Sequence, residues 1–251
     1  MSLTFDALLL DLSGVLYNQG VMVPGARDCV IAAREKGLQL RFVTNTATRS
    51  HNQILQNLLA MGLMAHVNEL YTAPRAARAY MEARDLHPLT LVHPAIADEF
   101  THLQTTNPNC VLLGDAREAL TYSALNQAFR LCQAGAPLIG IGLNRYFSSD
   151  KGLMLDAGAY ITGLAWAAGV VPIIMGKPST DFFQQVAAST GCPVQRCLMV
   201  GDDLNGDVIG ALNSGMQACL VQTGKYRPTD AAQLPPEAQL LPSIKQLFDT
   251  L

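Results

Sequence analysis

The chain has 251 residues, of which 49% are hydrophobic and 15% charged, and its formal net charge is −3. This composition excludes a disordered chain, and it lacks the basic balance that is typical of nucleic-acid binding. No stretch approaches the roughly 20 apolar residues of a membrane-spanning helix, and the 6 scattered cysteines, without a CxxC pair, are expected to be reduced thiols in a cytoplasmic protein.

The N-terminal part of the chain alternates short apolar runs with helical patterns. Residues 7–10 form an apolar run that ends at Asp11, which is typical of a strand buried on both faces of a parallel sheet. The pattern then predicts, in chain order, a helix over 24–37, a strand over 38–43 and a helix over 50–61. Strands that alternate with helices favour a doubly wound α/β fold.

The rest of the chain continues this alternation, but the signals for where helices and strands begin and end are weaker in its middle. The pattern predicts strands over 89–92, 110–113, 138–141, 171–175, 197–200 and 218–221, and helices over 122–133 and 180–189. We therefore expect an α/β protein with a doubly wound parallel sheet core and an inserted αβ cap domain. The core is predicted over residues 1–74 and 172–251, and the cap over residues 75–171.

Four polar clusters follow predicted strands of the core. They are Asp11-Leu12-Ser13, Thr44-Asn45-Thr46, Gly176-Lys177-Pro178-Ser179, and Gly201-Asp202-Asp203 with Asp207 beyond it. Each cluster alone could be an ordinary turn, and the coincidence of four is the signal. Ligands of an open parallel sheet bind outside the carboxyl ends of its strands, so these side chains are expected to surround one point.

The residue types in these clusters suit phosphoryl transfer. Asp11 and Asp202 offer the oxygen ligands that Mg²⁺ prefers, and an aspartate can also attack phosphorus as a covalent nucleophile. Lys177 would offset the repulsion between two anions, and the Thr44 hydroxyl would hold a phosphate oxygen. Asp207 is expected to orient Lys177 or a metal-bound water.

These four clusters, in this order, resemble the four motifs of the haloacid dehalogenase superfamily phosphatases. The GDxxxxD form from Asp202 to Asp207 and the cap between the second and third motifs belong to the same resemblance. Four stretches resemble the branch that contains phospholysine/phosphohistidine inorganic pyrophosphate phosphatase and hydrolase-domain-containing relatives. They are residues 11–17, 125–129, 152–155 and 223–227.

The resemblance implies a role for each cluster residue. Asp11 is the implied nucleophile, and Mg²⁺ is bound by the Asp11 carboxylate, the Ser13 backbone carbonyl and Asp202. Thr44, Asn45 and Lys177 are the implied contacts of the phosphoryl group, and Asp203 and Asp207 are supporting acidic residues. The implied partners are a small phosphorylated substrate and, without a sequence feature that requires it, a second copy in a homodimer.

Ser13 is a departure from most phosphatases of the superfamily, which carry a second aspartate two residues after the nucleophile. That aspartate protonates the leaving group, and a serine hydroxyl is a poor general acid near neutral pH. The branch named above shares the serine. We expect substrates whose leaving group needs little protonation, such as pyrophosphate or phosphoramidates, rather than alkyl phosphate esters.

Several alternatives stay open at this level. Replacement of the usual acid by Ser13 also suits a phosphate-binding or regulatory protein with little turnover. A second enzymatic alternative is phosphoryl transfer to an acceptor other than water, or cleavage of a phosphonate. It is weakly supported, because phosphonate enzymes typically use a cap lysine to form a Schiff base and the predicted cap has only one lysine, Lys151. Arg145 and Tyr146 follow a predicted cap strand and are either specificity residues or ordinary surface residues. Trp166 is expected to serve in packing rather than in recognition.

Overall fold

The structure is a computed structural model that describes residues 4–149 and 152–250. These residues divide into two compact units, and the second is inserted in the chain between segments of the first. The first unit holds the described residues up to Thr44, residues 52–71 and those from Lys177 onward, and the second holds residues 45–51 and 72–176. The predicted α/β class is confirmed, since parallel sheets alternate with helices in both units.

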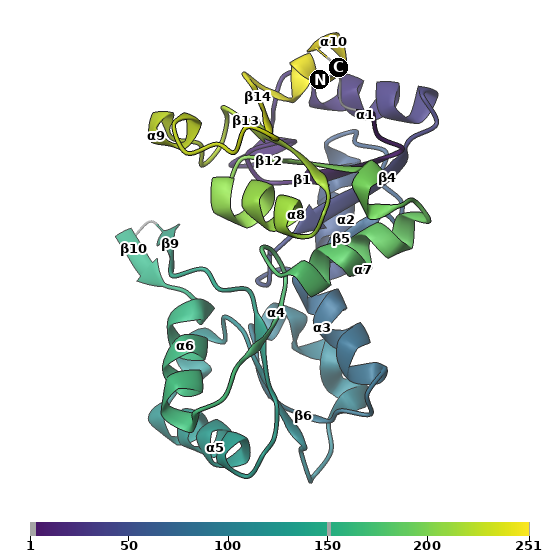
Figure 1. Cartoon of the computed structure of the whole chain (residues 1–251). Helices are drawn as coiled ribbons and strands as arrows, with labels where there is room; N and C mark the ends of the chain where they lie inside the picture. The colour runs from purple at the N-terminus through teal and green to yellow at the C-terminus, as the bar shows by residue number, and fades with distance from the viewer. Residues whose placement is uncertain (1–3, 150–151, 251) are drawn as a thin grey trace. The chain divides into compact units, whose positions relative to one another are not determined.

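The first unit is built on a six-stranded sheet (Figure 1). Its strands are, in spatial order, β14 (Gln239–Leu241), β13 (Gln217–Val221), β12 (Cys197–Gly201), β1 (Ala7–Asp11), β4 (Gln39–Thr44) and β5 (Leu70–Thr72). Strand β1 pairs in parallel with both β12 and β4, so it lies inside the sheet. Every residue of β1 and β12 is buried, as expected for strands that are covered on both faces.

Helices cover both faces of this sheet. Leu40 and Phe42 of β4 point into one apolar cluster with α1 (Ala26–Glu35) and α2 (His51–Ala60). Side chains alternate along a strand, and Arg41 accordingly points to the other face, where its Nε donates to Ser189 Oγ at 2.8 Å. That face carries α7 (Thr180–Thr190) and α8 (Gly210–Asn213) (Figure 1). Further short elements of this unit are β2 (Tyr17–Asn18), β3 (Val21–Met22), α9 (Pro228–Ala231) and α10 (Leu247–Thr250).

The second unit has its own four-stranded parallel sheet and its own apolar core. The strand order is β11 (Ile173–Met175), β8 (Leu138–Ile141), β7 (Cys110–Leu113) and β6 (Pro88–Leu91). Its helices are α3 (Ala73–Glu82), α4 (Pro94–Ala97), α5 (Tyr122–Gln133) and α6 (Ala157–Ala168). A separate antiparallel hairpin joins β9 (Tyr146–Ser149) to β10 (Gly152–Leu155).

Most predicted elements are confirmed with small shifts of their ends. Strands β7 and β8 and helix α5 begin and end at the predicted residues. The strand predicted over 171–175 is shorter and begins at Ile173, after Pro172, which has no N–H to donate to a sheet, and Val171, which is 90% exposed. The sequence did not predict the β9–β10 hairpin.

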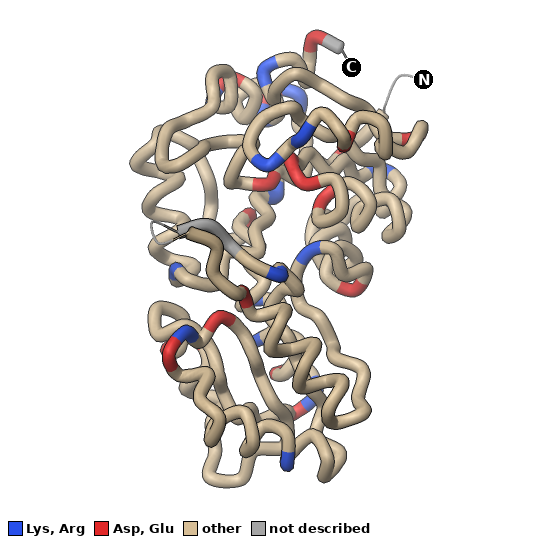
Figure 2. Tube along the Cα trace, turned by 90° about the vertical axis from the view of Figure 1, so that its left-hand side faces the viewer, with Lys and Arg blue, Asp and Glu red and all other residues tan. Residues whose placement is uncertain are grey.

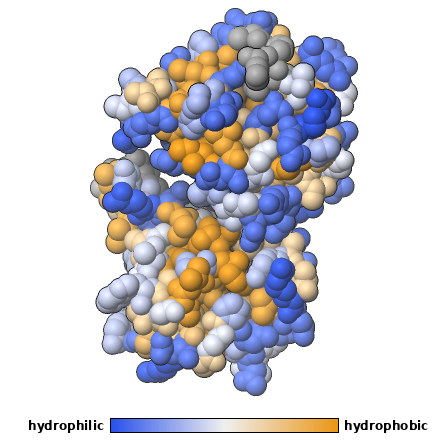
Figure 3. All heavy atoms as spheres, viewed as in Figure 1, coloured by the Kyte–Doolittle hydropathy of each residue, from blue (hydrophilic) through white to orange (hydrophobic). Residues whose placement is uncertain are grey.

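The prediction that Trp166 serves in packing is wrong. Its side chain is 85% exposed on α6, a helix without a single charged residue. Apolar side chains gather on the face of this unit that Figure 3 shows. A helix that is apolar on every side gives no sequence signal for which side faces the core, and this explains the error.

Charged residues of both signs are interspersed along each unit (Figure 2). This distribution agrees with a net charge of only −3. Among the described residues, no helix has both the length and the apolar character needed to cross a membrane.

Candidate active site

Three predicted site residues of the first unit stand at the carboxyl ends of neighbouring parallel strands. Asp11 is the last residue of β1, Thr44 is the last residue of β4, and Asp202 directly follows β12. Strand β1 lies between β4 and β12, so the sheet itself brings these side chains to one edge. This is the edge at which open α/β sheets bind ligands.

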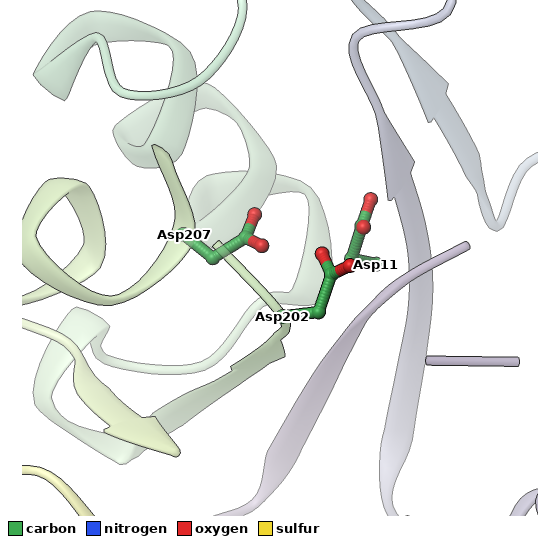
Figure 4. Close-up of side chains that lie close together, drawn as sticks. All are labelled: Asp11, Asp202 and Asp207. Atoms are coloured by element: carbon green, nitrogen blue, oxygen red, sulfur yellow. The ribbon is translucent and has the colours of Figure 1, made fainter. Parts of the chain in front are cut away.

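A fourth residue, Asp207, joins two of these side chains in an acidic cluster. Asp207 sits in a π-helical turn, Leu204–Ile209, that follows β12. One carboxylate oxygen each of Asp11, Asp202 and Asp207 lies within 4.8 Å of the other two, and all three residues are buried. Figure 4 shows the three carboxyl groups directed into the same space. Three buried anions so close together need compensating positive charge.

Lys177 supplies part of that charge. Its Nζ lies 2.6 Å from Asp11 Oδ1 and 2.6 Å from Asp207 Oδ1, and the lysine side chain is only 6% exposed. Burial lowers the pKa of Lys177, but the carboxylates of Asp11 and Asp207 outweigh burial and hold that pKa above its ordinary value. Lys177 is therefore a fixed cation beside Asp11 at neutral pH.

One lysine does not neutralise three carboxylates, and the remaining excess of negative charge appears in the pKa values. Burial, followed by the charges of Asp11 and Asp207, raises the pKa of Asp202 to about 7. Burial raises the pKa of Asp207 to about 6, although the Lys177 charge opposes this effect. The cluster therefore favours an additional cation or a proton.

The cluster fits a hard divalent cation. Asp202 Oδ1 is buried without a hydrogen-bond partner, whereas Oδ2 of the same carboxylate accepts from the Lys225 backbone N–H at 2.6 Å. A buried oxygen without a partner is costly, and a metal ion would satisfy it. The donors are carboxylate oxygens, which suit Mg²⁺ rather than a soft metal.

Asp203 and Ser13 flank this cluster. The Asp203 carboxylate accepts from the backbone N–H groups of Asn205 and Gly206 at 3.1 and 2.9 Å, so it shapes the turn that carries Asp207. Burial would raise the pKa of Asp203, but the Gly206 N–H and the charge of Lys225 bring it below its ordinary value. Ser13 is exposed.

The other predicted residues belong to the second unit. Asn45 is in that unit, where its Oδ1 lies 2.7 Å from the position that a Cβ on Gly176 would occupy. Arg145 and Tyr146 precede or begin β9 of the same unit, and both are exposed. Lys151 lies outside the described residues.

The segment Thr223–Lys225 contacts the site, and the sequence-based reasoning assigned it no role there. It follows β13, the neighbour of β12, and reaches Asp202 through the Lys225 backbone N–H. Its position directly after a buried apolar strand is the same signal that identified the other clusters.

Two family models match the chain. The model described as haloacid dehalogenase-like hydrolase matches residues 8–106, and the model described as HAD-hydrolase-like matches residues 174–247. Haloacid dehalogenase-like hydrolase domain-containing protein 2 from Bos taurus is 39% identical over 234 residues, covering 93% of this chain and 90% of that protein. Human phospholysine phosphohistidine inorganic pyrophosphate phosphatase is 37% identical over 229 residues, covering 89% and 85%.

Solved structures share the fold over nearly the whole chain. A p-nitrophenyl phosphatase from Archaeoglobus fulgidus superposes with a TM-score of 0.90 at 23% identity, covering 99% of this chain and 100% of that one. A glycerol phosphate phosphatase from Mycobacterium tuberculosis, solved in complex with magnesium, has a TM-score of 0.83 at 24% identity, covering 97% and 77%. The chain therefore belongs to the haloacid dehalogenase-like hydrolase family and is an enzyme of its phosphatase group.

Proposed function

We propose that this protein is a magnesium-dependent phosphatase that hydrolyses small phosphorylated compounds through a phosphoryl group carried on Asp11. The observation that carries the proposal is the convergence of three buried carboxylates with one buried lysine at the carboxyl ends of β1 and β12. Such a set supplies a nucleophile, ligands for a cation and a positive charge within one small volume.

The residues proposed to hold magnesium are Asp11 and Asp202 through their carboxylates and Ser13 through its backbone carbonyl. The unpartnered Asp202 Oδ1 supports this choice. When bound, the ion would neutralise charge on the phosphoryl oxygens and on the attacking carboxylate. The mycobacterial glycerol phosphate phosphatase that shares this fold was solved in complex with magnesium, which supports magnesium as the ion.

Asp11 is proposed to attack the phosphorus atom through one carboxylate oxygen. The new oxygen–phosphorus bond forms as the bond to the leaving group breaks, and water then hydrolyses the aspartyl-phosphate to release inorganic phosphate. Lys177 would stabilise the equatorial phosphoryl oxygens, and Thr44 and Asn45 would bind the transferred group. Asp207 holds the Lys177 ammonium at 2.6 Å and would thereby orient it toward the substrate.

Magnesium removal tests this proposal. With a chelator present, phosphate release from a panel of pyrophosphate, phosphoramidates and alkyl phosphates should fall at least about 100-fold, because metal catalysis of this kind supplies several kcal/mol. Addition of excess magnesium should restore the rate, which a malachite-green phosphate assay would follow. Turnover that persists unchanged in chelator would refute magnesium dependence.

We further propose that the substrates have leaving groups that need little protonation. Ser13 provides no carboxyl acid beside Asp11, and the human relative is named for action on phospholysine, phosphohistidine and inorganic pyrophosphate. Phosphate departs from pyrophosphate, and an amine or imidazole departs from a phosphoramidate, without help from a strong protein acid. Simple alkyl esters require a proton on the departing oxygen.

The Ser13→Asp variant tests this substrate preference. It should raise kcat/KM for an alkyl phosphate by roughly 10- to 100-fold, since a positioned carboxyl is typically worth about 10²–10⁴-fold, and it should change pyrophosphate hydrolysis little. The exposed position of Ser13 gives the longer side chain room. Ser13→Asn is the control of matched size without an acid. An equal gain on both substrates, or no gain on the alkyl ester, would contradict the preference.

Three further assignments complete the proposal. Residues 75–171 would act as the cap, and residues 1–74 and 172–251 as the catalytic core. The protein would work in the cytoplasm, where all 6 cysteines can remain the free thiols observed. It would form a homodimer, as the sequence resemblance implies.

A further inference from the structure

We infer that the turn Thr223-Gly224-Lys225 is a positioning clamp for the metal site, holding Asp202 and the loop that carries the Ser13 carbonyl in register with each other. This inference rests on the proposed magnesium dependence and deepens it. The proposed role of the clamp is positioning. It acts on Asp202 directly and on the Ser13 carbonyl through the neighbouring Gly14 peptide.

The first half of the clamp holds Asp202. The Lys225 backbone N–H donates to Asp202 Oδ2 at 2.6 Å, and this contact leaves Oδ1 buried and without a hydrogen-bond partner. One oxygen of the Asp202 carboxylate is thus hydrogen-bonded to the protein, and the other is left for the proposed metal ion. Because the donor is a backbone group, its position depends on the path of the turn and not on the rotamer of the lysine.

The second half of the clamp holds the loop after Asp11. Thr223 Oγ1 donates to the Gly14 carbonyl oxygen at 2.5 Å, and the Gly14 N–H donates to the Tyr17 carbonyl oxygen at 2.7 Å. The Gly14 N–H belongs to the same planar peptide as the Ser13 carbonyl, so its hydrogen bond determines where that carbonyl points. The two bonds together fix both peptides that flank Gly14.

Glycine is required on both sides of the Asp202 carboxylate. A Cβ on Gly224 would stand 1.9 Å from Asp202 Oδ2 and 2.5 Å from the Gly14 Cα. A Cβ on Gly14 would stand 2.0 Å from the same oxygen, and both glycines have positive φ, at +61° and +90°. The backbones at Gly14 and Gly224 therefore leave no room for a Cβ between them and the Asp202 carboxylate. This close packing couples the loop after β1 to the turn after β13.

The Thr223→Val variant tests the clamp, because it removes one hydroxyl and preserves the shape of the side chain. Isothermal titration with magnesium alone should show a dissociation constant raised about 10-fold, as is typical when a group that supports a metal ligand is lost. The half-saturating magnesium concentration for phosphate release should rise by the same factor, whereas kcat at saturating magnesium should fall much less. Thr223→Ser retains the hydroxyl and should restore wild-type magnesium binding.

Tyr226→Phe is the matched control. It also removes one hydroxyl, from the residue directly after this turn, and that hydroxyl accepts from Gln222 Nε2 at 3.1 Å. Its magnesium affinity should equal that of the wild type. Unchanged magnesium binding in Thr223→Val, or equal weakening in Thr223→Ser and Thr223→Val, would overturn the clamp.

A measurement on the wild type covers the case in which Thr223→Val does not fold. Magnesium should slow amide hydrogen exchange in peptides over residues 222–226 as well as in those over residues 12–17 and 202–207. Protection of the latter two segments without any change at 222–226 would overturn the clamp and leave the proposed function intact. A wild type that neither binds magnesium nor requires it would overturn both.

Discussion

Asp11→Asn is expected to lower kcat/KM for phosphate release by at least roughly 10⁴-fold, the order of loss seen when a covalent nucleophile is removed. The amide keeps the size of the side chain but lacks a nucleophilic oxygen anion. The fold should survive, because Lys177 retains its second carboxylate partner, Asp207, at 2.6 Å. Circular dichroism and urea unfolding would verify this.

A quench experiment separates covalent catalysis from metal binding. Wild-type enzyme stopped in acid during turnover should carry one phosphoryl group on the peptide that contains Asp11, detectable by mass spectrometry, and Asp11→Asn should carry none. Asp28→Asn, an exposed change of the same kind on α1, should keep wild-type turnover. Retention of more than a tenth of the wild-type rate by Asp11→Asn would refute the nucleophile assignment.

Asp11 and Asp202 of the acidic cluster could be predicted because charged residues next to long apolar runs are unusual. Asp11 and Asp202 each stand at the end of a continuous apolar run, and those runs are the fully buried strands β1 and β12. A charged residue directly after such a strand lies at the carboxyl end of the sheet, which is the edge where open α/β sheets bind ligands. The local sequence therefore predicted the strand, its burial and the position of the charged residue at its end.

The Thr223–Lys225 turn also follows a buried apolar strand, β13, but its role could not be predicted, because that role depends on contacts between distant parts of the chain. Lys225 donates through its backbone, which has no sequence signature, and Thr223 reaches a carbonyl 209 positions away. The orientation of α6 was equally inaccessible, since an uncharged helix carries no polar face to mark its exposed side. A sequence pattern identifies residues that are unusual in their local sequence. It does not identify residues such as Thr223, whose role comes from tertiary contacts.

Lys177→Met is expected to abolish most activity and also to destabilise the metal-free protein. Loss of the ammonium leaves the buried carboxylates of Asp11 and Asp207 without their shared cation, close to the carboxylate of Asp202. Removal of one partner from a buried ion pair typically costs about 3–5 kcal/mol. The same change should lower kcat at saturating magnesium by about 10²–10³-fold, in line with the loss of one group that stabilises a transition-state charge.

The stability deficit should depend on pH with a definite sign. Carboxyl groups whose folded-state pKa is raised favour folding when protonated, and burial and repulsion already raise the pKa of Asp202 to about 7 and that of Asp207 to about 6. Without the Lys177 charge, these values should rise further. The loss in unfolding free energy should therefore be small at pH 5, where the carboxyls take up protons, and should grow between pH 5 and pH 8.

Urea unfolding in chelator at both pH values would measure this deficit, with Lys225→Met as the matched control. Lys225 also faces a carboxylate, Asp203 Oδ2 at 3.5 Å, but its side chain is 65% exposed. A solvent-exposed pair is worth about 0–1 kcal/mol, so the control should be nearly neutral at either pH. If the two lysine variants had equal stability at pH 8, Lys177 would not be the counter-charge that holds the three carboxylates together, and its role would be confined to the substrate.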